Sequence, residues 1–135
     1  MADSTGVASY PVAPDLAARL ERLEQAAGEG KAEAMYQLGA AHAQGRGVAK
    51  NLTEAARWFH EASKRGHAKA KTSIAYLYAT GRGVRYDPRI AFIFFSEAVA
   101  AGDLQAGDML FKLRRTMQPA QIRDAEKHLR NRAAP

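Results

Sequence analysis

The sequence repeats itself with a period of 36 residues, and this period restricts the possible folds more than any other feature. Glycines recur at this spacing at Gly30, Gly66 and Gly102. The tetrapeptide Gly-Arg-Gly-Val also occurs twice, at 45–48 and at 81–84. Periods of roughly 20 to 50 residues are typical of proteins whose units stack in a line and bury their apolar faces against their neighbours. The sequence therefore predicts an array of stacked units.

Each unit is predicted to contain two helices, because apolar residues recur three or four positions apart between glycine-rich turns. The first helix of the first unit is expected over residues 31–44. Asn51 is placed to cap the second helix, and Asp87, followed by proline, repeats the arrangement one unit later. Gly66 and Gly102 are expected to end the second helices with positive φ angles, which glycine tolerates best.

The two units share a pattern of small, glycine and aromatic positions. In the first unit these are Ala34, Leu38, Gly39, Gly45, Gly47, Val48, Ala55, Trp58, Ala62 and Gly66. In the second they are Ala70, Tyr78, Gly81, Gly83, Val84, Asp87, Ala91, Ala98 and Gly102. This pattern resembles that of the Sel-one-like repeat family, a relative of the tetratricopeptide repeats. The units depart from the pattern at Asn51 and His42, and at Ala75 and Phe94. Tetratricopeptide repeats proper are a second choice, because they are slightly shorter and lack the Gly-x-Gly-Val loop.

The resemblance implies an all-α, right-handed α-solenoid of antiparallel helix pairs, with about seven helices, and a role in protein–protein interaction. We expect a flexible N-terminal tail over residues 1–14 and one repeat domain over 15–132. Within that domain we expect a capping helix at 15–29, repeats at 30–65 and 66–101, and a degenerate third repeat with a capping helix at 102–132. The third unit has lost its Gly-Arg-Gly-Val loop and is two residues short, as terminal units of solenoids often are.

The composition narrows the expected chemistry and compartment. The chain has no cysteine, which excludes disulfides, thiolate zinc sites and cysteine nucleophiles and fits a reducing compartment. The N-terminus lacks the basic start and apolar run of a secretory signal, so we expect a cytoplasmic protein. The most apolar run, 90–95, has six residues, whereas a membrane helix needs about 20. We therefore expect no membrane insertion.

No residue pattern indicates a catalytic, metal or cofactor site. The Gly-Arg-Gly-Val loops lack the third glycine of a dinucleotide fingerprint and the Gly-Lys-Ser/Thr of a phosphate loop. His42, His60, His67 and His128 do not have the spacing of ligands on one helix face, and packing is the simpler interpretation. No serine stands in a Gly-x-Ser-x-Gly turn. We expect no enzyme activity and no cofactor, although a catalytic group without a sequence signature is an alternative.

Positive charge is concentrated after residue 30. The whole chain carries a net charge of +6, and residues 31–135 hold eighteen bases against nine acids. A predicted basic patch around the turn between the units consists of Lys64, Arg65, His67 and Lys71. It could meet an acidic partner or be an ordinary solvated face. Nucleic acid is disfavoured as a partner, because neither stacking aromatics nor a groove-entering helix accompanies the bases.

The concave surface of a helical solenoid is its usual binding surface, and the first helices of the units line it. Helical spacing predicts a concave row of residues opposite the buried positions: Glu33, Tyr36, Gln37, Lys69, Thr72, Ser73, Tyr76, Gln105, Asp108 and Lys112. Tyr36 and Tyr76 combine an apolar ring with a hydroxyl group, the amphipathic type favoured in peptide anchors. Alternatively, both rings fill gaps between the repeats.

A second surface is indicated by the outward face of the second helix in unit two. Ile90, Ile93 and Glu97 stand where unit one has Glu54, Arg57 and Glu61. A helix that is apolar nearly all round must be covered. Either the terminal helix folds over it through Ile122 and Leu129, or it meets a second copy of the chain or a partner's helix.

Together these features predict a non-catalytic adaptor. It would bind a peptide or helix of an acidic or amphipathic protein partner on its concave face, with a homodimer as a further possibility. The resemblance suggests bacterial signalling or the assembly of a complex. The alternatives are a basic accessory protein associated with nucleic acid and an enzyme without a recognisable motif.

Overall fold

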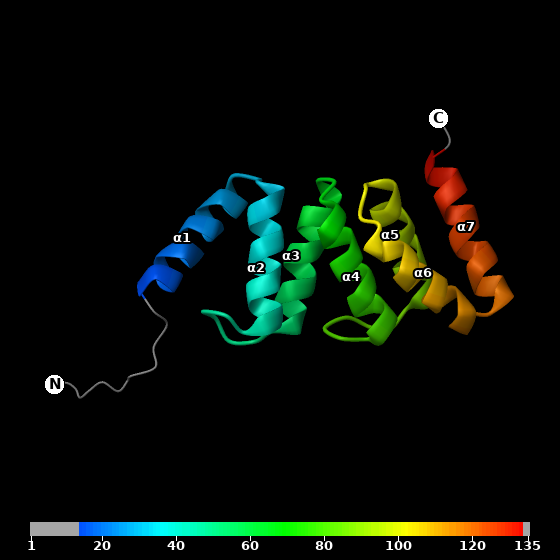
Figure 1. Ribbon diagram of the computed structural model, residues 1–135, viewed down its shortest axis with the longest axis horizontal. Helices are drawn as coiled ribbons and strands as arrows, with labels where there is room; N and C mark the ends of the chain where they lie inside the picture. The colour runs from blue at the N-terminus through cyan, green and yellow to red at the C-terminus, as the bar shows by residue number, and fades with distance from the viewer. Residues whose placement is uncertain (1–13, 134–135) are drawn as a thin grey trace.

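The computed structural model describes residues 14–133, and that part of the chain forms seven helices and no strand. The helices are α1 (Pro14–Gly28), α2 (Ala32–Gln44), α3 (Leu52–Lys64), α4 (Ala68–Thr80), α5 (Pro88–Ala100), α6 (Gln105–Thr116) and α7 (Pro119–Ala133). They lie side by side in chain order from one end of the molecule to the other (Figure 1). The predicted tail over 1–14 lies outside the described residues, apart from Pro14. The all-α solenoid is confirmed.

The second helices begin and end with the predicted local structures. The Asn51 side chain accepts a hydrogen bond from the backbone N–H of Glu54 at 3.0 Å, and Asp87 caps α5 in the same way. Gly66 and Gly102 follow these helices with φ angles of +86° and +107°. The predicted caps and glycine stops are therefore confirmed. They fix each helix boundary with interactions that are local in the sequence.

Each of the two Gly-Arg-Gly-Val loops joins the two helices of one unit, α2 to α3 or α4 to α5, and both lie on the same edge of the molecule, which is the lower edge in Figure 1. The first glycine of each loop, Gly45 or Gly81, ends the preceding helix in the left-handed conformation. The second glycine packs against an earlier helix: a Cβ on Gly47 would lie 2.5 Å from a methyl carbon of Leu20. A Cβ on Gly83 would similarly lie 2.6 Å from the Leu52 carbonyl carbon. The loops therefore lock each unit onto the one before it.

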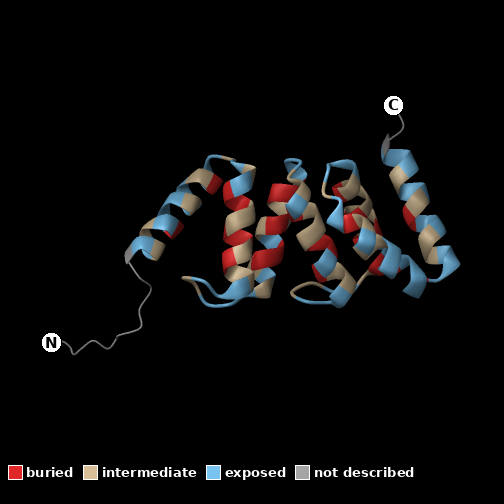
Figure 2. Cartoon of the chain, viewed as in Figure 1, coloured by how far each residue is buried: buried red, intermediate tan, exposed pale blue. Residues whose placement is uncertain are grey.

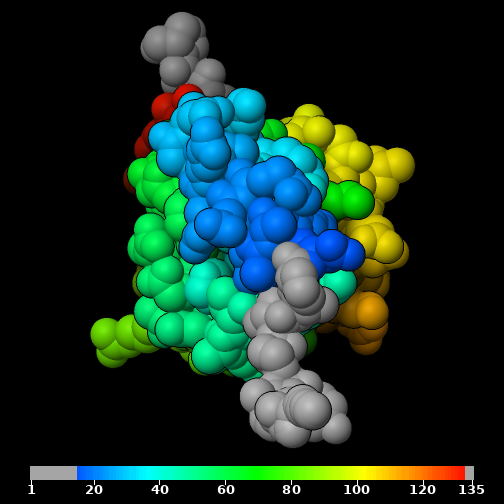
Figure 3. Space-filling view, turned by 90° about the vertical axis from the view of Figure 1, so that its left-hand side faces the viewer, coloured from blue at the N-terminus to red at the C-terminus, as the bar shows by residue number. Residues whose placement is uncertain are grey.

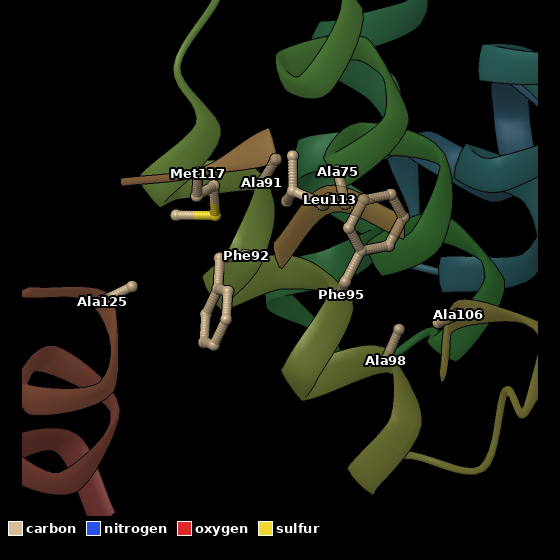
Figure 4. Packing of buried hydrophobic residues seen from close by; sticks show 9 residues of the cluster. All are labelled: Ala75, Ala91, Phe92, Phe95, Ala98, Ala106, Leu113, Met117 and Ala125. Atoms are coloured by element: carbon tan, nitrogen blue, oxygen red, sulfur yellow. The ribbon is translucent and has the colours of Figure 1, made fainter. Parts of the chain in front are cut away.

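Alanine and aromatic side chains form the core between consecutive helices. Buried residues concentrate on α2 to α5 (Figure 2). Phe95, Leu38 and Ile74 are the largest fully buried side chains. Around Phe95, small residues such as Ala75 and Ala106 let four helices approach (Figure 4). Buried alanines thus set the close helix spacing, and the aromatic rings fill the remaining space.

The third unit does not close as a helix pair. α7 packs mainly on α5, whereas α3 packs on α2 and α5 on α4 within their own units. Phe111 stands at the repeat position of Gly39 and Ala75. At Gly39 even a Cβ would lie 2.6 Å from the Phe59 ring, so a small residue is needed where two helices meet this closely. The phenyl ring of Phe111 leaves no room for such an approach and is 63% exposed.

Candidate functional site

A groove runs between α2 and α4 and brings together part of the predicted concave row. This central groove encloses about 630 Å³, part of it open to solvent. It is lined by Tyr36, Ala40, Ala43, Gln44, Leu52, Phe59, Ser73, Tyr76, Leu77 and Arg82. Of the predicted row, Tyr36, Ser73 and Tyr76 therefore share one site. Apolar residues with a few polar groups among them are the usual lining of sites that hold a ligand.

The two tyrosines of the central groove have different surroundings. The Tyr36 ring stacks on His67 at a centroid distance of 4.6 Å and tilts against Phe59 at 5.7 Å. It is half-buried and therefore fills the gap between the two repeats, as one of the two sequence interpretations proposed. Tyr76 also lines the groove, but it is 40% exposed. Tyr76 is thus the aromatic side chain that a ligand in this groove can reach.

A second groove lies between α1 and α2, at the end of the molecule that α1 covers (Figure 3). This N-terminal groove encloses about 410 Å³, again partly open to solvent. Its lining residues are Leu16, Arg19, Leu20, Leu23, Gln37, Ala40, Ala41, Gln44 and Arg46. It shares Ala40 and Gln44 with the central groove, so the two grooves form one continuous surface across α2. Of these lining residues, the concave row predicted from the sequence contains only Gln37.

A chain of hydrogen bonds crosses the same surface and links three helices. Arg19 donates to the Gln37 side chain at 2.9 Å, and Gln37 donates to Glu33 at 2.7 Å. The other Glu33 oxygen lies 2.7 Å from His67 Nε2. His67 Nδ1 accepts from the backbone N–H of Ala70, so the proton on the ring is on Nε2, which donates to Glu33. These residues hold α1, α2 and α4 in register beside the grooves.

The hydrogen bond from His67, followed by that from Gln37, holds the pKa of Glu33 below its ordinary value of 4.5. Because the carboxylate is favoured in the folded state, its contribution to stability is present above pH 4.5 and is lost as the pH falls through the folded-state pKa. We expect the melting temperature of the Glu33→Gln variant to fall less than that of the wild type between pH 5 and pH 3. Thermal unfolding followed by circular dichroism across this range is the measurement; equal pH dependence would contradict the role of Glu33.

The remaining residues of the concave row lie outside the two grooves. The Thr72 hydroxyl donates to Asp103 at 2.6 Å and so ties α4 to the turn before α6. Lys69 is exposed at the start of α4. In α6, the exposed members are Gln105, Asp108 and Lys112. The row is therefore present on three helices, but only its α2 and α4 parts line a groove.

The side chains of the predicted basic patch are paired within the chain. Lys64 and Arg65 both contact Glu61, at 3.0 and 3.3 Å. His67 contacts Glu33, and Lys71, whose side chain is only 15% exposed, lies 3.4 Å from Glu97. Carboxylates therefore pair with the three cations Lys64, Arg65 and Lys71, and His67 donates a hydrogen bond to Glu33. These interactions join residues within one unit and between units.

The terminal helix α7 packs on part of the apolar face of α5. Ile93 and the side chains of Ile122 and Leu129 pack against one cluster, which matches the intramolecular alternative predicted from the sequence. A cleft remains between α5 and α7, lined by Asp87, Arg89, Ile90, Ile93, Phe94, Asp124, Ala125, His128 and Arg132. Ion pairs join the two helices at both ends, from Arg89 to Asp124 at 3.3 Å and from Arg132 to Glu97 at 2.6 Å. Glu97 therefore pairs with Arg132 of α7 and also with Lys71 of α4.

Two further observations concern metal binding and membranes. Between residues 14 and 133, no three histidine, aspartate or glutamate side chains are grouped closely enough to hold a metal ion. None of the helices in this range is both long enough and apolar enough to cross a membrane.

Comparisons with known proteins identify the repeats. The model of the Sel1 repeat family matches residues 32–67 and 68–103, which together make up more than half of the chain. No curated protein matches the sequence significantly.

Solved structures with the same architecture include a Sel1 repeat protein from Oxalobacter formigenes, with a TM-score of 0.68 and 30% identity over 70% of this chain and 39% of that one. Another is a protective antigen of uropathogenic Escherichia coli strains that displays an SLR fold, with a TM-score of 0.77 and 29% identity over 79% of this chain and 23% of that one. The chain thus spans less than half the length of either protein. With two consecutive repeats matched and the helix arrangement shared, the chain belongs to the Sel1 repeat family.

Proposed function

We propose that the chain is a non-catalytic adaptor that binds an extended segment of a partner protein on the surface formed by α1, α2 and α4. Repeats of this family generally serve as protein-interaction scaffolds. The observation that carries the proposal is the central groove, in which Tyr76 is accessible above an apolar floor that contains Phe59 and Leu77. Aromatic side chains in such positions supply a large share of the binding energy in protein interfaces.

The shape of the surface supports an extended segment rather than a small molecule. Two grooves follow one another across α2 and are open to solvent, which suits a chain that lies across the helices. The stacking of Tyr36 on His67 and the chain of hydrogen bonds from Arg19 to His67 hold the groove walls, α1, α2 and α4, in place. Tyr76 takes no part in these contacts. The surface is therefore preorganised, which reduces the ordering cost of binding.

Several sequence-based expectations remain predictions in this proposal. They are the cytoplasmic location, the bacterial setting in signalling or complex assembly, and the homodimer. The contributions of Lys69, Gln105, Asp108 and Lys112 to binding also remain predictions, as does the role of the basic patch. The partner segment need not reach α6, because both grooves lie on the N-terminal side of the array.

A selection of short random peptides displayed on phage tests the proposal. We expect the selected peptides to bind Tyr76→Ala at least about tenfold more weakly than the wild type, as for a hot-spot residue. Tyr86→Ala is the matched control, because Tyr86 is 58% exposed and lines neither groove. Isothermal titration calorimetry measures both affinities, and melting temperatures check that each variant is folded.

Equal affinity of the selected peptides for the wild type and Tyr76→Ala would rule out the central groove as their site. The same conclusion would follow if Tyr86→Ala weakened binding as much as Tyr76→Ala.

A further inference from the structure

The N-terminal and central grooves are two copies of one site. Their lining residues correspond at the 36-residue period of the sequence. The corresponding pairs are Leu16 and Leu52, Leu23 and Phe59, Gln37 and Ser73, Ala40 and Tyr76, Ala41 and Leu77, and Arg46 and Arg82. In the N-terminal groove, α1 contributes the residues that α3 contributes in the central groove. The array therefore presents the same kind of groove twice in succession.

Each copy has an arginine at the same end. Arg46 and Arg82 are the arginines of the two Gly-Arg-Gly-Val loops, and both are exposed. Within residues 14–133, neither forms an ion pair, whereas the cations of the basic patch pair with Glu61 and Glu97. The guanidinium groups of the grooves are therefore available to an external anion, and planar guanidinium groups suit carboxylates in particular.

The third unit lacks this site. At the repeat positions of Tyr76 and Arg82 it has Lys112 and Gln118, and its Gly-Arg-Gly-Val loop is missing. In addition, its second helix, α7, packs mainly on α5 rather than on α6. The described part of the chain thus carries two copies of the groove, next to each other.

We propose, resting on the proposed function, that the partner is an extended acidic segment with two apolar side chains about three residues apart. One apolar side chain enters each groove, and a carboxylate next to it pairs with Arg46 or Arg82. The two grooves lie on either side of α2. A helix with its side chains is about 10 to 12 Å across, and an extended chain covers about 10 Å in three residues. The surplus of positive charge beyond residue 30 favours the same acidic ligand.

Two synthetic peptides test the proposal, both acetylated and amidated so that chain ends carry no charge. The first, Ser-Phe-Glu-Ser-Phe-Glu-Ser, has two anchors at the proposed spacing. The second, Ser-Phe-Glu-Ser-Ser-Glu-Ser, has the same charge and one anchor. We expect the two-anchor peptide to bind the full-length chain at least about tenfold more tightly, because the second contact forms within the bound complex.

A second experiment compares the loss of Arg46 and Arg82 with the loss of two other cations of the same loops. We expect the Arg46→Ala, Arg82→Ala double variant to bind the two-anchor peptide at least about tenfold more weakly than the wild type. The control double variant, Lys50→Ala with Arg85→Ala, loses the same charge from exposed positions that line neither groove. It should remain within about threefold of the wild type, since only general attraction is reduced. Fluorescence anisotropy of labelled peptides measures all affinities.

Each other outcome overturns the inference. Equal weakening in both double variants would show general charge attraction, and equal affinity of the two peptides would show that only one groove is used. Failure of both peptides to bind would also overturn it. The proposed function would still stand if library-selected peptides depended on Tyr76, and it would fail if they did not.

Discussion

The Phe95→Ala variant is expected to lose about 3–5 kcal/mol of unfolding free energy, a large part of the stability of a small domain. Phe95 is 1% exposed and stands in the cluster where α4, α5, α6 and α7 meet (Figure 4). Removing its ring leaves a cavity that alanines such as Ala75 and Ala106 cannot fill. Urea unfolding followed by circular dichroism measures the change.

Phe111→Ala is the matched control for this prediction. The same atoms are removed, but Phe111 is 63% exposed on α6, so its loss should change the unfolding free energy by less than about 1 kcal/mol. A loss at Phe111 as large as at Phe95 would show that a second helix covers α6 after all. A small loss at Phe95 would contradict the packing of the C-terminal cluster.

The Gly83→Ala variant is expected to be destabilised by more than about 2 kcal/mol, for two independent reasons. Gly83 has a φ of +76°, a conformation that alanine rarely adopts. In addition, the new Cβ would lie 2.6 Å from the carbonyl carbon and 2.8 Å from the Cβ of Leu52. The backbone of α3 cannot yield as a flexible side chain could, so loop and helix must move apart.

Gly66→Ala separates these two causes. Gly66 has a similar φ of +86°, but nothing lies within 4 Å of the position of its Cβ. This variant should therefore lose only about 1 kcal/mol, the conformational part of the cost. If both variants were equally destabilised in urea unfolding, the contact between the second loop and α3 would not contribute to stability.

The features that the sequence predicted best depend on residues close together in the chain. Asn51 and Asp87 cap helices through atoms two or three residues away, and Gly66 and Gly102 stop them through their own φ angles. The repeat then extends these local rules to the whole solenoid, because each unit contacts mainly its neighbours. For this reason the fold could be inferred without knowledge of the side-chain packing.

Features that depend on distant partners could not be predicted in the same way. His67 and Lys71 were assigned to a basic patch, but their carboxylates, Glu33 and Glu97, come from other helices. Charge counted along the sequence does not show which side chains meet in space. Likewise, only the structure shows that Tyr36 is packed on His67 while Tyr76 remains accessible.

Differences and matches between repeat positions in the sequence indicated both the position of α7 and the two grooves. Phe111 replaces the small residues Gly39 and Ala75, which indicates that two helices cannot approach there. Arg46 and Arg82 recur at one period, and the concave row did not include them because they stand in loops. Comparing repeat positions for size and charge as well as for helix pattern would have drawn attention to both.

The most direct test of the central claim is to map a bound peptide by NMR. Labelled full-length chain is titrated with the two-anchor peptide while backbone amide shifts are recorded. The account predicts changes along α1, α2 and α4 and in the two Gly-Arg-Gly-Val loops, with little change in α7. Changes centred on the cleft between α5 and α7, around Ile90 and His128, would contradict it and place the binding surface at the other end of the solenoid.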